Sequence, residues 1–408
     1  MINIEALFIF SLSLIAYACL GYPALIFVLG GLRPRSVRKA DISPRVSVII
    51  AAYNEERDIA ATIESALALD YPREKLEIIV ASDCSTDRTD EIARSFADRG
   101  VFLYRQQKRL GKTMAQNSAV EASSGDVLVF TDATTGVQSD ALRKLVRCFA
   151  DSEVGCASSR LVYVDRSQTA VGSGCRSYWS YEQFLRAAES RVGSIIGVTG
   201  CLYAVRRTSY TALDHDMCSD FVIASEIHLK GLRSVDEPEA IAIEDTNNRT
   251  RDEFRMRVRI MEQTMNALSR YREVLSLRRH GLFAFQMLSH KVLRYSVSAL
   301  LLVALLSNAF IVNESEIYQA TMALQVAFYV SALSGWILSN FGVRIGPLAL
   351  PYYFVLANAA IIVAFAKRVR GEAHVVWNPL REPIQSREAL ADANSATGEK
   401  RVPVSAER

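Results

Sequence analysis

The sequence predicts an α/β domain with a parallel sheet and with transmembrane helices on both sides of it. Four short apolar segments between residues 46 and 130 alternate with segments of helical character, which is the pattern of βαβ units that wind into a parallel sheet. The 408-residue chain is also 50% hydrophobic, and this excess is concentrated at its two ends. A chain of this length holds one domain of roughly 200 to 250 residues and a sizeable remainder.

The amino-terminal apolar segment, residues 6–29, carries no charge and is long enough to cross a hydrocarbon core of ~30 Å. A cleaved signal peptide is the alternative, but no basic segment precedes the run, and the run is too long for one. A buried core helix would seldom stay apolar for so many turns. Arg33, Arg35 and Arg38 follow directly. Residues 1–32 are therefore expected to form a transmembrane helix with its amino terminus outside and the following chain in the cytoplasm.

The soluble part is expected to cover residues 44–277. Its first half alternates strands and helices, and its second half is less regular. The expected strands begin at Val46, Leu76, Val101 and Val127, and the helices between them cover residues 58–69, 89–98 and 112–122. Right-handed crossovers would place these helices on both faces of the sheet.

Carboxylates follow two of these strands directly. Asp83 follows the second strand, and Asp132 follows the fourth. The carboxyl ends of parallel strands form the ligand crevice of an open α/β sheet. A carboxylate there accepts hydrogen bonds from ribose hydroxyls or the uracil N–H, or it binds a hard cation that neutralises a diphosphate. The first role suits Asp83 and the second suits Asp132, whereas Asp87 is as well explained as a helix cap.

Four motifs occur in an order that is specific when they are taken together. They are Tyr53-Asn54-Glu55 after the first strand, Ser82-Asp83-x-Ser85-Thr86-Asp87, Lys108-Arg109-Leu110-Gly111-Lys112-x-x-Ala115-x-Asn117, and Phe130-Thr131-Asp132-Ala133. With them, nearly the whole chain resembles the family 2 glycosyltransferases, the membrane enzymes related to cellulose, hyaluronan and poly-N-acetylglucosamine synthases.

The resemblance implies the nucleotide-diphospho-sugar transferase fold of the A type and a set of donor-binding residues. It implies that the nucleoside is held by Tyr53, Glu55 and Asp83, that Lys112 approaches the diphosphate or base, and that Asp132 binds Mg²⁺ or Mn²⁺. The chain departs from the family in one respect. The usual Asp-x-Asp is Asp132-Ala133-Thr134 here, so the metal has one carboxylate and, as a weaker candidate ligand, the Thr134 hydroxyl.

A second part of the resemblance concerns the acceptor side. Residues 199–207 resemble the acceptor-side strand of the family, and residues 218–223 stand where relatives carry Glu-Asp or Asp-Asp. Inverting transfer needs a carboxylate that removes the proton of the acceptor hydroxyl, and Asp220 is the predicted base. Glu226 is the alternative base. The non-catalytic explanation of Asp220 is that it only caps the helix that follows it.

An arginine-rich segment, residues 249–263, stands where relatives carry Gln-x-x-Arg-Trp. Arg259 matches best, and its guanidinium would stabilise the leaving diphosphate. The alternative is a basic helix on anionic lipid, because Phe254, Val258 and Met261 form an apolar stripe. The roles of Arg255 and Arg257 stay open.

Three more apolar stretches, residues 295–312, 322–338 and 348–366, predict two or three spans within residues 281–370. Three spans would put Lys367, Arg368 and Arg370 on the outer side, against the positive-inside rule. Residues 348–366 are the stronger candidate for a re-entrant or interfacial segment, because Pro351 and Asn358 interrupt them. Residues 371–408 are expected to form a polar tail.

These inferences predict an inverting, metal-dependent glycosyltransferase that uses a UDP-sugar at the cytoplasmic face of the cell (inner) membrane. As a multi-pass protein it would extend a polysaccharide or a glycolipid. The alternative enzyme transfers a single sugar to a lipid-linked acceptor. An alternative of another class is a catalytically silent channel or scaffold, but the presence of Asp83, Asp132 and Asp220 argues against it. The expected partners are the donor, a saccharide or lipid-linked acceptor and membrane lipid, with export partners left open. A net charge of +3 does not indicate nucleic acid, and seven scattered cysteines fit a reduced domain.

Overall fold

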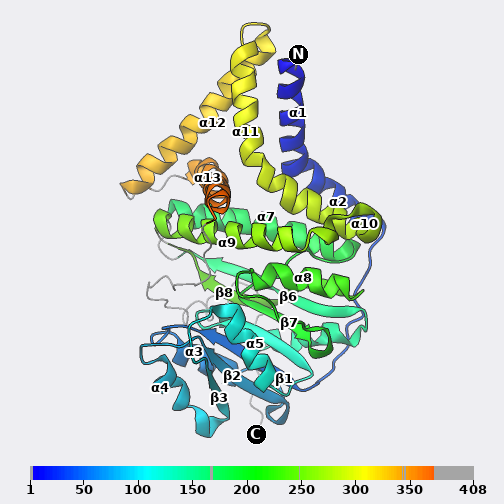
Figure 1. Cartoon of the computed structure of the whole chain (residues 1–408), viewed down its shortest axis with the longest axis vertical. Coiled ribbons are helices and arrows are strands. Elements are labelled where there is room, and N and C mark those ends of the chain that lie inside the picture. Colours follow the sequence, from blue (N-terminus) through cyan, green and yellow to red (C-terminus); the bar gives the residue numbers. More distant parts are fainter. Residues whose placement is uncertain (1–2, 166–168, 248, 342, 344–345, 372–408) are drawn as a thin grey trace, which may run out of the picture.

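The computed structural model describes residues 3–165, 169–247, 249–341, 343 and 346–371. Figure 1 shows a sheet with its flanking helices at one end of the molecule, two long helices lying across it, and apolar helices rising at the other end. The amino terminus lies at the far end from the sheet. The polar tail predicted for residues 371–408 lies outside the described residues, apart from Gly371.

Within the described residues, one mixed sheet of eight strands forms the centre of the soluble part, in the order β3-β2-β1-β4-β7-β6-β8-β5. Its strands are β1 (Val46–Ala52), β2 (Leu76–Ser82), β3 (Val101–Arg105), β4 (Val127–Asp132), β5 (Gly136–Val137), β6 (Val154–Val164), β7 (Leu202–Arg206) and β8 (Arg233–Asp245). The first four strands begin at the predicted residues and pair in parallel, so this part of the prediction is confirmed. Beyond β4 the sheet is mixed, because β7 runs antiparallel to both β4 and β6.

The central strand β1 is buried along its whole length, as expected for a parallel strand covered on both faces. Its alternate side chains meet different helices. Val48 and Ile50 pack in a core shared with α3 (Ile59–Leu67), whereas Ile49 packs in a second core shared with α5 (Lys112–Ala122). The period-2 alternation of one strand therefore holds helices on both faces of the sheet.

The register of the parallel strands brings their carboxyl ends together. Ala52 of β1 lies beside Ser82 of β2, and Ala51 lies beside Asp132 of β4. The turns that follow β1 and β2 and the end of β4 are therefore neighbours, although they are far apart in the sequence.

Two long helices, α7 (Ala170–Val192) and α9 (Thr250–Arg270), lie between the sheet and the apolar helices. The shorter helix α8 (Ser219–Leu229) lies below them in Figure 1 and packs against β6, β8 and α9. All seven cysteines of the chain are free thiols, as predicted.

Among the described residues, four helical segments are long and apolar enough to cross a membrane. They are Ile4–Leu32 (α1, Ile4–Ala16, and α2, Tyr22–Leu32), Leu277–Ile311 (α10, Leu277–Gln286, and α11, Leu293–Ile311), α12 (Glu316–Asn340) and Gly346–Val369, which contains α13 (Ala349–Val369). A π-helical turn joins α1 to α2 over Tyr17–Gly21, and another joins α10 to α11 over Met287–Val292.

Helix α13 has a different direction from α11. Figure 1 shows α13 nearly end-on, whereas α11 runs along the long axis of the molecule. α13 packs on α7 and α9 as well as on α12. At its basic end, Lys367 lies 3.6 Å from a carboxylate oxygen of Glu262, and Arg368 bonds Asn266 and, at 2.7 Å, Ser269 of α9. The last apolar segment is therefore attached to the soluble domain along its length.

Candidate functional site

A cavity of about 1290 Å³ extends from the carboxyl ends of the parallel strands to the apolar helices. Every residue that the sequence assigned to donor binding or catalysis lines it. These residues are Tyr53, Glu55, Asp83, Lys112, Asp132, Asp220 and Arg259. The fold thus brings together side chains from β1, β2, β4, α5, α8 and α9, while the role of each stays a prediction.

Asp83 anchors the loop that precedes α5. Its two carboxylate oxygens accept hydrogen bonds of 2.8 Å from the backbone N–H groups of Leu110 and Gly111. Burial raises the pKa of Asp83, and these two N–H groups oppose the rise. Gly111 has φ of +96°, a conformation that residues with a side chain rarely adopt. Asp83 therefore fixes the start of α5 and with it Lys112, a role that the sequence did not reveal.

The ammonium of Lys112 lies at the centre of the site. It forms an ion pair with Asp132 and donates a hydrogen bond of 3.2 Å to the carbonyl of Gly200. Burial alone would lower the pKa of Lys112, but the charge and hydrogen bond of Asp132, together with the charges of Asp220 and Glu244, raise it. Lys112 is therefore a charged group held between β4 and the segment that leads into β7.

Glu244, at the end of β8, is a carboxylate of this site that the sequence analysis missed. It lines the cavity and accepts a hydrogen bond of 2.8 Å from the Thr135 hydroxyl. Burial and the neighbouring charge of Asp132 raise its pKa to about 7. The sequence did contain a signal for Glu244, namely the acidic pair Glu244-Asp245 at the end of an apolar strand. The same pattern, a carboxylate at the end of an apolar strand, identifies Asp132.

Asp220 lies in the first turn of α8, near Gly200. Its backbone carbonyl accepts a hydrogen bond of 2.8 Å from the N–H of Val198, and its carboxylate accepts one of 2.7 Å from the thiol of Cys218. A side-chain carbon at position 200 would lie 2.7 Å from a carboxylate oxygen of Asp220, so a side chain there would displace this carboxylate. Cys218 is the N-cap residue of α8, and no side-chain hydrogen bond caps this helix. The alternative in which Asp220 only caps α8 is therefore not supported.

The alternative base, Glu226, has a different environment. It accepts a hydrogen bond of 2.6 Å from the hydroxyl of Tyr271, a residue that directly follows α9. Of the two acids weighed from the sequence, Asp220 lines the cavity and Glu226 does not.

The arginines of α9 divide into two kinds. Arg257 is buried, and its guanidinium lies 2.9 Å from Glu253 and bonds Tyr353 of α13. Arg259 instead contacts Gln263 at 3.5 Å. Burial lowers its pKa, while the charges of Asp220 and other cavity groups oppose this shift. Arg257 therefore joins helices, whereas Arg259 faces the acids of the site.

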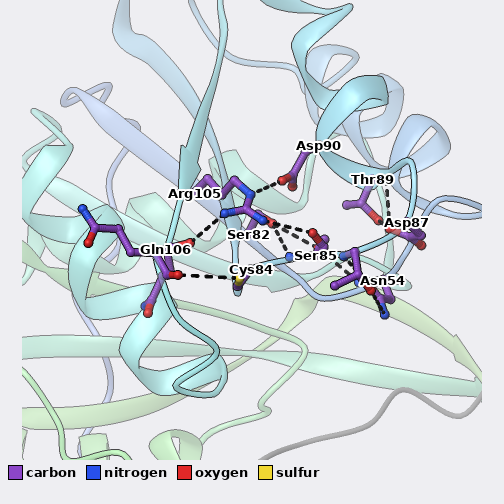
Figure 2. A network of polar contacts seen from close by, with 11 residues as sticks. Asn54, Ser82, Cys84, Ser85, Asp87, Thr89, Asp90, Arg105 and Gln106 are labelled. Carbon is purple, nitrogen blue, oxygen red and sulfur yellow. Dashed lines mark hydrogen bonds and ion pairs between the residues drawn. The ribbon is translucent and has the colours of Figure 1, made fainter.

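The turns after β1 and β2 are held by the network in Figure 2. Asn54 and Cys84 both have positive φ, of 55° and 60°, and each stands two residues after its strand. The backbone N–H of Asn54 donates to the Ser85 hydroxyl at 3.1 Å. Asp87 accepts a hydrogen bond of 3.0 Å from the backbone N–H of Thr89, the first residue of α4 (Thr89–Arg94). Asp87 is thus a structural residue of the turn.

Figure 2 also shows how the edge strand supports these turns. Arg105, at the end of β3, forms an ion pair of 2.6 Å with Asp90 and donates to the carbonyl of Ser85 at 3.3 Å. Nearby, the guanidinium of Arg109 stacks 3.7 Å above the ring of Tyr53. The part of the cavity that is expected to hold the nucleoside is therefore bordered by a polar network.

The residues present can accommodate a divalent cation, although no group of three His, Cys, Asp or Glu side chains with metal-site geometry occurs among the described residues. Asp132 and Glu244 are close enough for the charge of one to raise the pKa of the other, and Thr134 also lines the cavity. Carboxylate and hydroxyl oxygens are ligands that Mg²⁺ and Mn²⁺ accept. Lys112 would have to release Asp132 for this carboxylate to bind a cation with both oxygens.

Known proteins resemble the chain in sequence and in fold. It is 26% identical over 202 residues to poly-beta-1,6-N-acetyl-D-glucosamine synthase of Staphylococcus aureus (strain COL), covering 48% of each chain. It is 31% identical over 179 residues to an N-acetylglucosaminyltransferase of Rhizobium sp. (strain N33), covering 43% of this chain and 40% of that protein. The aligned part is thus about half the length of these curated relatives.

A solved structure extends the likeness to the apolar helices. The mannosyltransferase of Pyrobaculum calidifontis, in complex with GDP-Man and Mn²⁺, matches with a TM-score of 0.69 and 22% identity, over 90% of this chain and 99% of that one. At this identity the match establishes the fold. The family model described as glycosyl transferase family 2 matches residues 47–213. Residues 47–213 are therefore similar to family 2 glycosyl transferase domains, and the fold is the nucleotide-diphospho-sugar transferase fold of the A type.

Proposed function

We propose that the protein is an inverting, metal-dependent glycosyltransferase that moves a sugar from a UDP-sugar to a hydroxyl of a growing polysaccharide or glycolipid. One observation carries the proposal. The acid expected to act as base, Asp220, shares a single cavity with the donor-side residues Asp83, Lys112 and Asp132 and with Arg259. A scaffold protein without catalytic activity has no need for this arrangement.

The chemistry follows from the positions of the side chains. Asp220 takes the proton of the acceptor hydroxyl as that oxygen forms a bond to the anomeric carbon. The bond from this carbon to the diphosphate oxygen breaks on the opposite side, and the diphosphate leaves with the electron pair, so the configuration inverts. Lys112 and Arg259 are the cations that face the charge developing on the diphosphate.

A divalent metal would supply further neutralisation of that diphosphate. Asp132 and Glu244 are the residues that would hold it, with Thr134 as a weaker ligand. Lys112 would then exchange its ion pair with Asp132 for a contact to the donor, so the ammonium keeps a negative partner in both states.

The family resemblance implies uracil as the nucleobase of the donor. The two relatives named above are a synthase of poly-N-acetylglucosamine and an N-acetylglucosaminyltransferase. The Pyrobaculum enzyme, however, was solved with GDP-Man. Guanine is therefore the alternative base to be tested, on the side of the cavity formed by Tyr53, Glu55 and Asp83.

We further propose that the soluble domain is cytoplasmic and that α1 with α2, α11 and α12 span the cell (inner) membrane. The crosswise direction of α13 supports this topology. With three spans and α13 at the inner surface, the basic residues Lys367 and Arg368 lie on the side of the soluble domain, as Arg33 does. The positive-inside rule is then satisfied at both ends.

The decisive experiment is a screen for donor binding and hydrolysis by the purified protein. A panel of UDP-sugars with GDP-mannose would be incubated with Mn²⁺, Mg²⁺ or a chelator, and release of the nucleoside diphosphate would be measured. We expect one donor to be hydrolysed in a metal-dependent manner. A folded protein that binds no nucleoside diphosphate would contradict the proposal and favour the scaffold alternative.

A further inference from the structure

The cavity continues past the catalytic acids and changes character along its length. Near the strand ends its wall is polar, as described above. Toward the apolar helices the wall is formed by hydrophobic side chains of α11, α12 and α13. They include Val297, Phe328, Leu350, Phe354 and Ile361. A cavity that is polar at one end and apolar at the other fits an amphiphilic ligand.

A buried network of charges lies beside the passage between the two ends. The ring nitrogens of His290 lie 3.0 Å from Glu182 and 2.8 Å from Glu189 of α7. Because both nitrogens face carboxylate oxygens, the ring donates from both and is an imidazolium. Arg294 pairs with the second oxygen of Glu182 at 2.8 Å. The two carboxylates are therefore balanced by His290 and Arg294.

Lys291 adds a third cation beside the two carboxylates of this network, without a direct ion pair to either of them. Its ammonium lies 5.9 Å from the ring centroid of Phe221, the residue after Asp220, and its side chain lines the cavity. Within the described part of the chain, no carboxylate lies within ion-pair distance of this ammonium. A desolvated cation in such a position is costly unless an anion pairs with it.

The backbone around Lys291 is also unusual. Lys291 lies in the π-helical turn Met287–Val292, and such turns occur frequently at functional sites. The turn faces the other one, because the hydroxyl of Tyr17 lies 3.1 Å from that of Ser289. His290, Lys291 and Arg294 all line the cavity.

We propose that the acceptor is an anionic amphiphile, a lipid that carries a phosphate. Its phosphate lies against Lys291, its hydroxyl-bearing head reaches Asp220, and its hydrocarbon chain lies along the apolar wall of α11, α12 and α13. The inference rests on the proposed function, in which Asp220 takes the proton of that hydroxyl while the sugar bond to the diphosphate breaks. It favours a lipid acceptor over a free polysaccharide, because hydrophobic side chains form the end of the cavity that a growing saccharide would have to occupy.

The test is a binding measurement on the full-length protein in dodecyl maltoside micelles. Isothermal titration calorimetry would compare hexadecyl phosphate with inorganic phosphate and with neutral hexadecyl maltoside. The variants are Lys291→Gln and Lys291→Arg. The matched control is Lys144→Gln, because Lys144 lies in α6 (Ala141–Val146), and its ion pair of 2.7 Å is with Asp140. Thermal midpoints would show that each variant is folded.

We expect saturable binding of hexadecyl phosphate to the wild type, weakened at least about tenfold in Lys291→Gln and largely retained in Lys291→Arg. Lys144→Gln should bind as the wild type does. Equal binding by wild type and Lys291→Gln would overturn the proposal, as would loss of binding in a folded Lys291→Arg. Inorganic phosphate that binds as tightly would indicate a soluble anion, and hexadecyl maltoside that binds as tightly would indicate an uncharged lipid; either overturns it. Binding of nucleoside diphosphates to the same wild-type sample is measured separately, so failure of the donor site is distinguishable from failure of the lipid site.

Discussion

The ammonium of Lys112 forms an ion pair with the carboxylate of Asp132 and also donates a hydrogen bond of 3.2 Å to the carbonyl of Gly200. Gly200 in turn lies against Asp220, and a side chain at position 200 would displace the Asp220 carboxylate. A single cation thus connects the acid expected to bind metal with the segment that packs against the expected base. The halves of the site that are expected to bind the donor and the acceptor are joined through these few contacts.

Replacing Asp132 tests the metal. Asp132→Ala removes the strongest oxygen ligand and leaves the diphosphate without part of its neutralisation, so turnover should fall by about 10²-fold or more. The measurement is donor hydrolysis over a Mn²⁺ titration. Unchanged activity of this variant, or full wild-type activity in excess chelator, would be incompatible with metal dependence.

A pair of acid variants tests the base. Asp220→Asn keeps the volume but cannot accept a proton, so transfer should fall by about 10² to 10⁴ while the nucleoside diphosphate still binds. Glu226→Gln is the matched control, because its partner is Tyr271, and it should transfer at a rate close to the wild type. The reverse result would show that Glu226 is the base.

The arginines of α9 should separate catalysis from stability. Arg259→Ala removes a cation that faces the diphosphate, so transfer should fall by about 10²-fold at nearly unchanged stability. Arg257→Ala leaves the buried Glu253 without its cation, with only the hydrogen bonds from Asn247 and Tyr353, which should lower the free energy of unfolding by about 3 kcal/mol. Rates and thermal midpoints of both variants check this. Equal midpoints would remove the structural role given to Arg257.

A half-buried histidine predicts a pH dependence of stability. Burial and the neighbouring His280 lower the pKa of His228 to about 4, whereas an unfolded chain has a histidine pKa of about 6.5. Between these values the unfolded state binds more protons, so the stability present above pH 6.5 is lost as the pH falls toward 4. His228→Gln lacks this titration, and its thermal midpoint should fall less between pH 7.5 and pH 5. Equal falls in both proteins would refute the assignment.

Cysteine labelling tests the orientation in the membrane. Figure 1 shows the turn between α11 and α12 at the end of the molecule that is far from the sheet. In a background without native cysteines, Glu314→Cys in this turn should react with an impermeant reagent added outside intact cells. Arg160→Cys, on β6, should react only after lysis. Labelling of Arg160→Cys in intact cells would place the domain outside and would remove the basis for a cytoplasmic donor.

Much of the fold could be predicted because the signals that define it are local. The starts of β1, β2, β3 and β4 follow from apolar runs of β-branched residues, and α5 follows from the glycine and lysine that open it. Asp83 and Asp132 were found because strand order alone places the ends of parallel strands at one edge. The four apolar segments were visible from length and composition.

The contacts within the site were decided by the tertiary structure. The sequence did not show that Asp83 anchors the loop before Lys112, that Lys112 pairs with Asp132, or that Glu244 joins them from β8. The first two contacts depend on how the loop before α5 packs beside the ends of β2 and β4, and the third depends on the mixed order of the sheet beyond β4. No local pattern encodes either. The crosswise direction of α13 depends in the same way on its packing against α7 and α9. The sequence by itself determined which chemical groups stand at the ends of which elements, because periodicity and turn residues act over a few positions. Only the tertiary structure decided which of these groups meet, because that depends on strand order, register and helix packing between segments that are separate in the sequence.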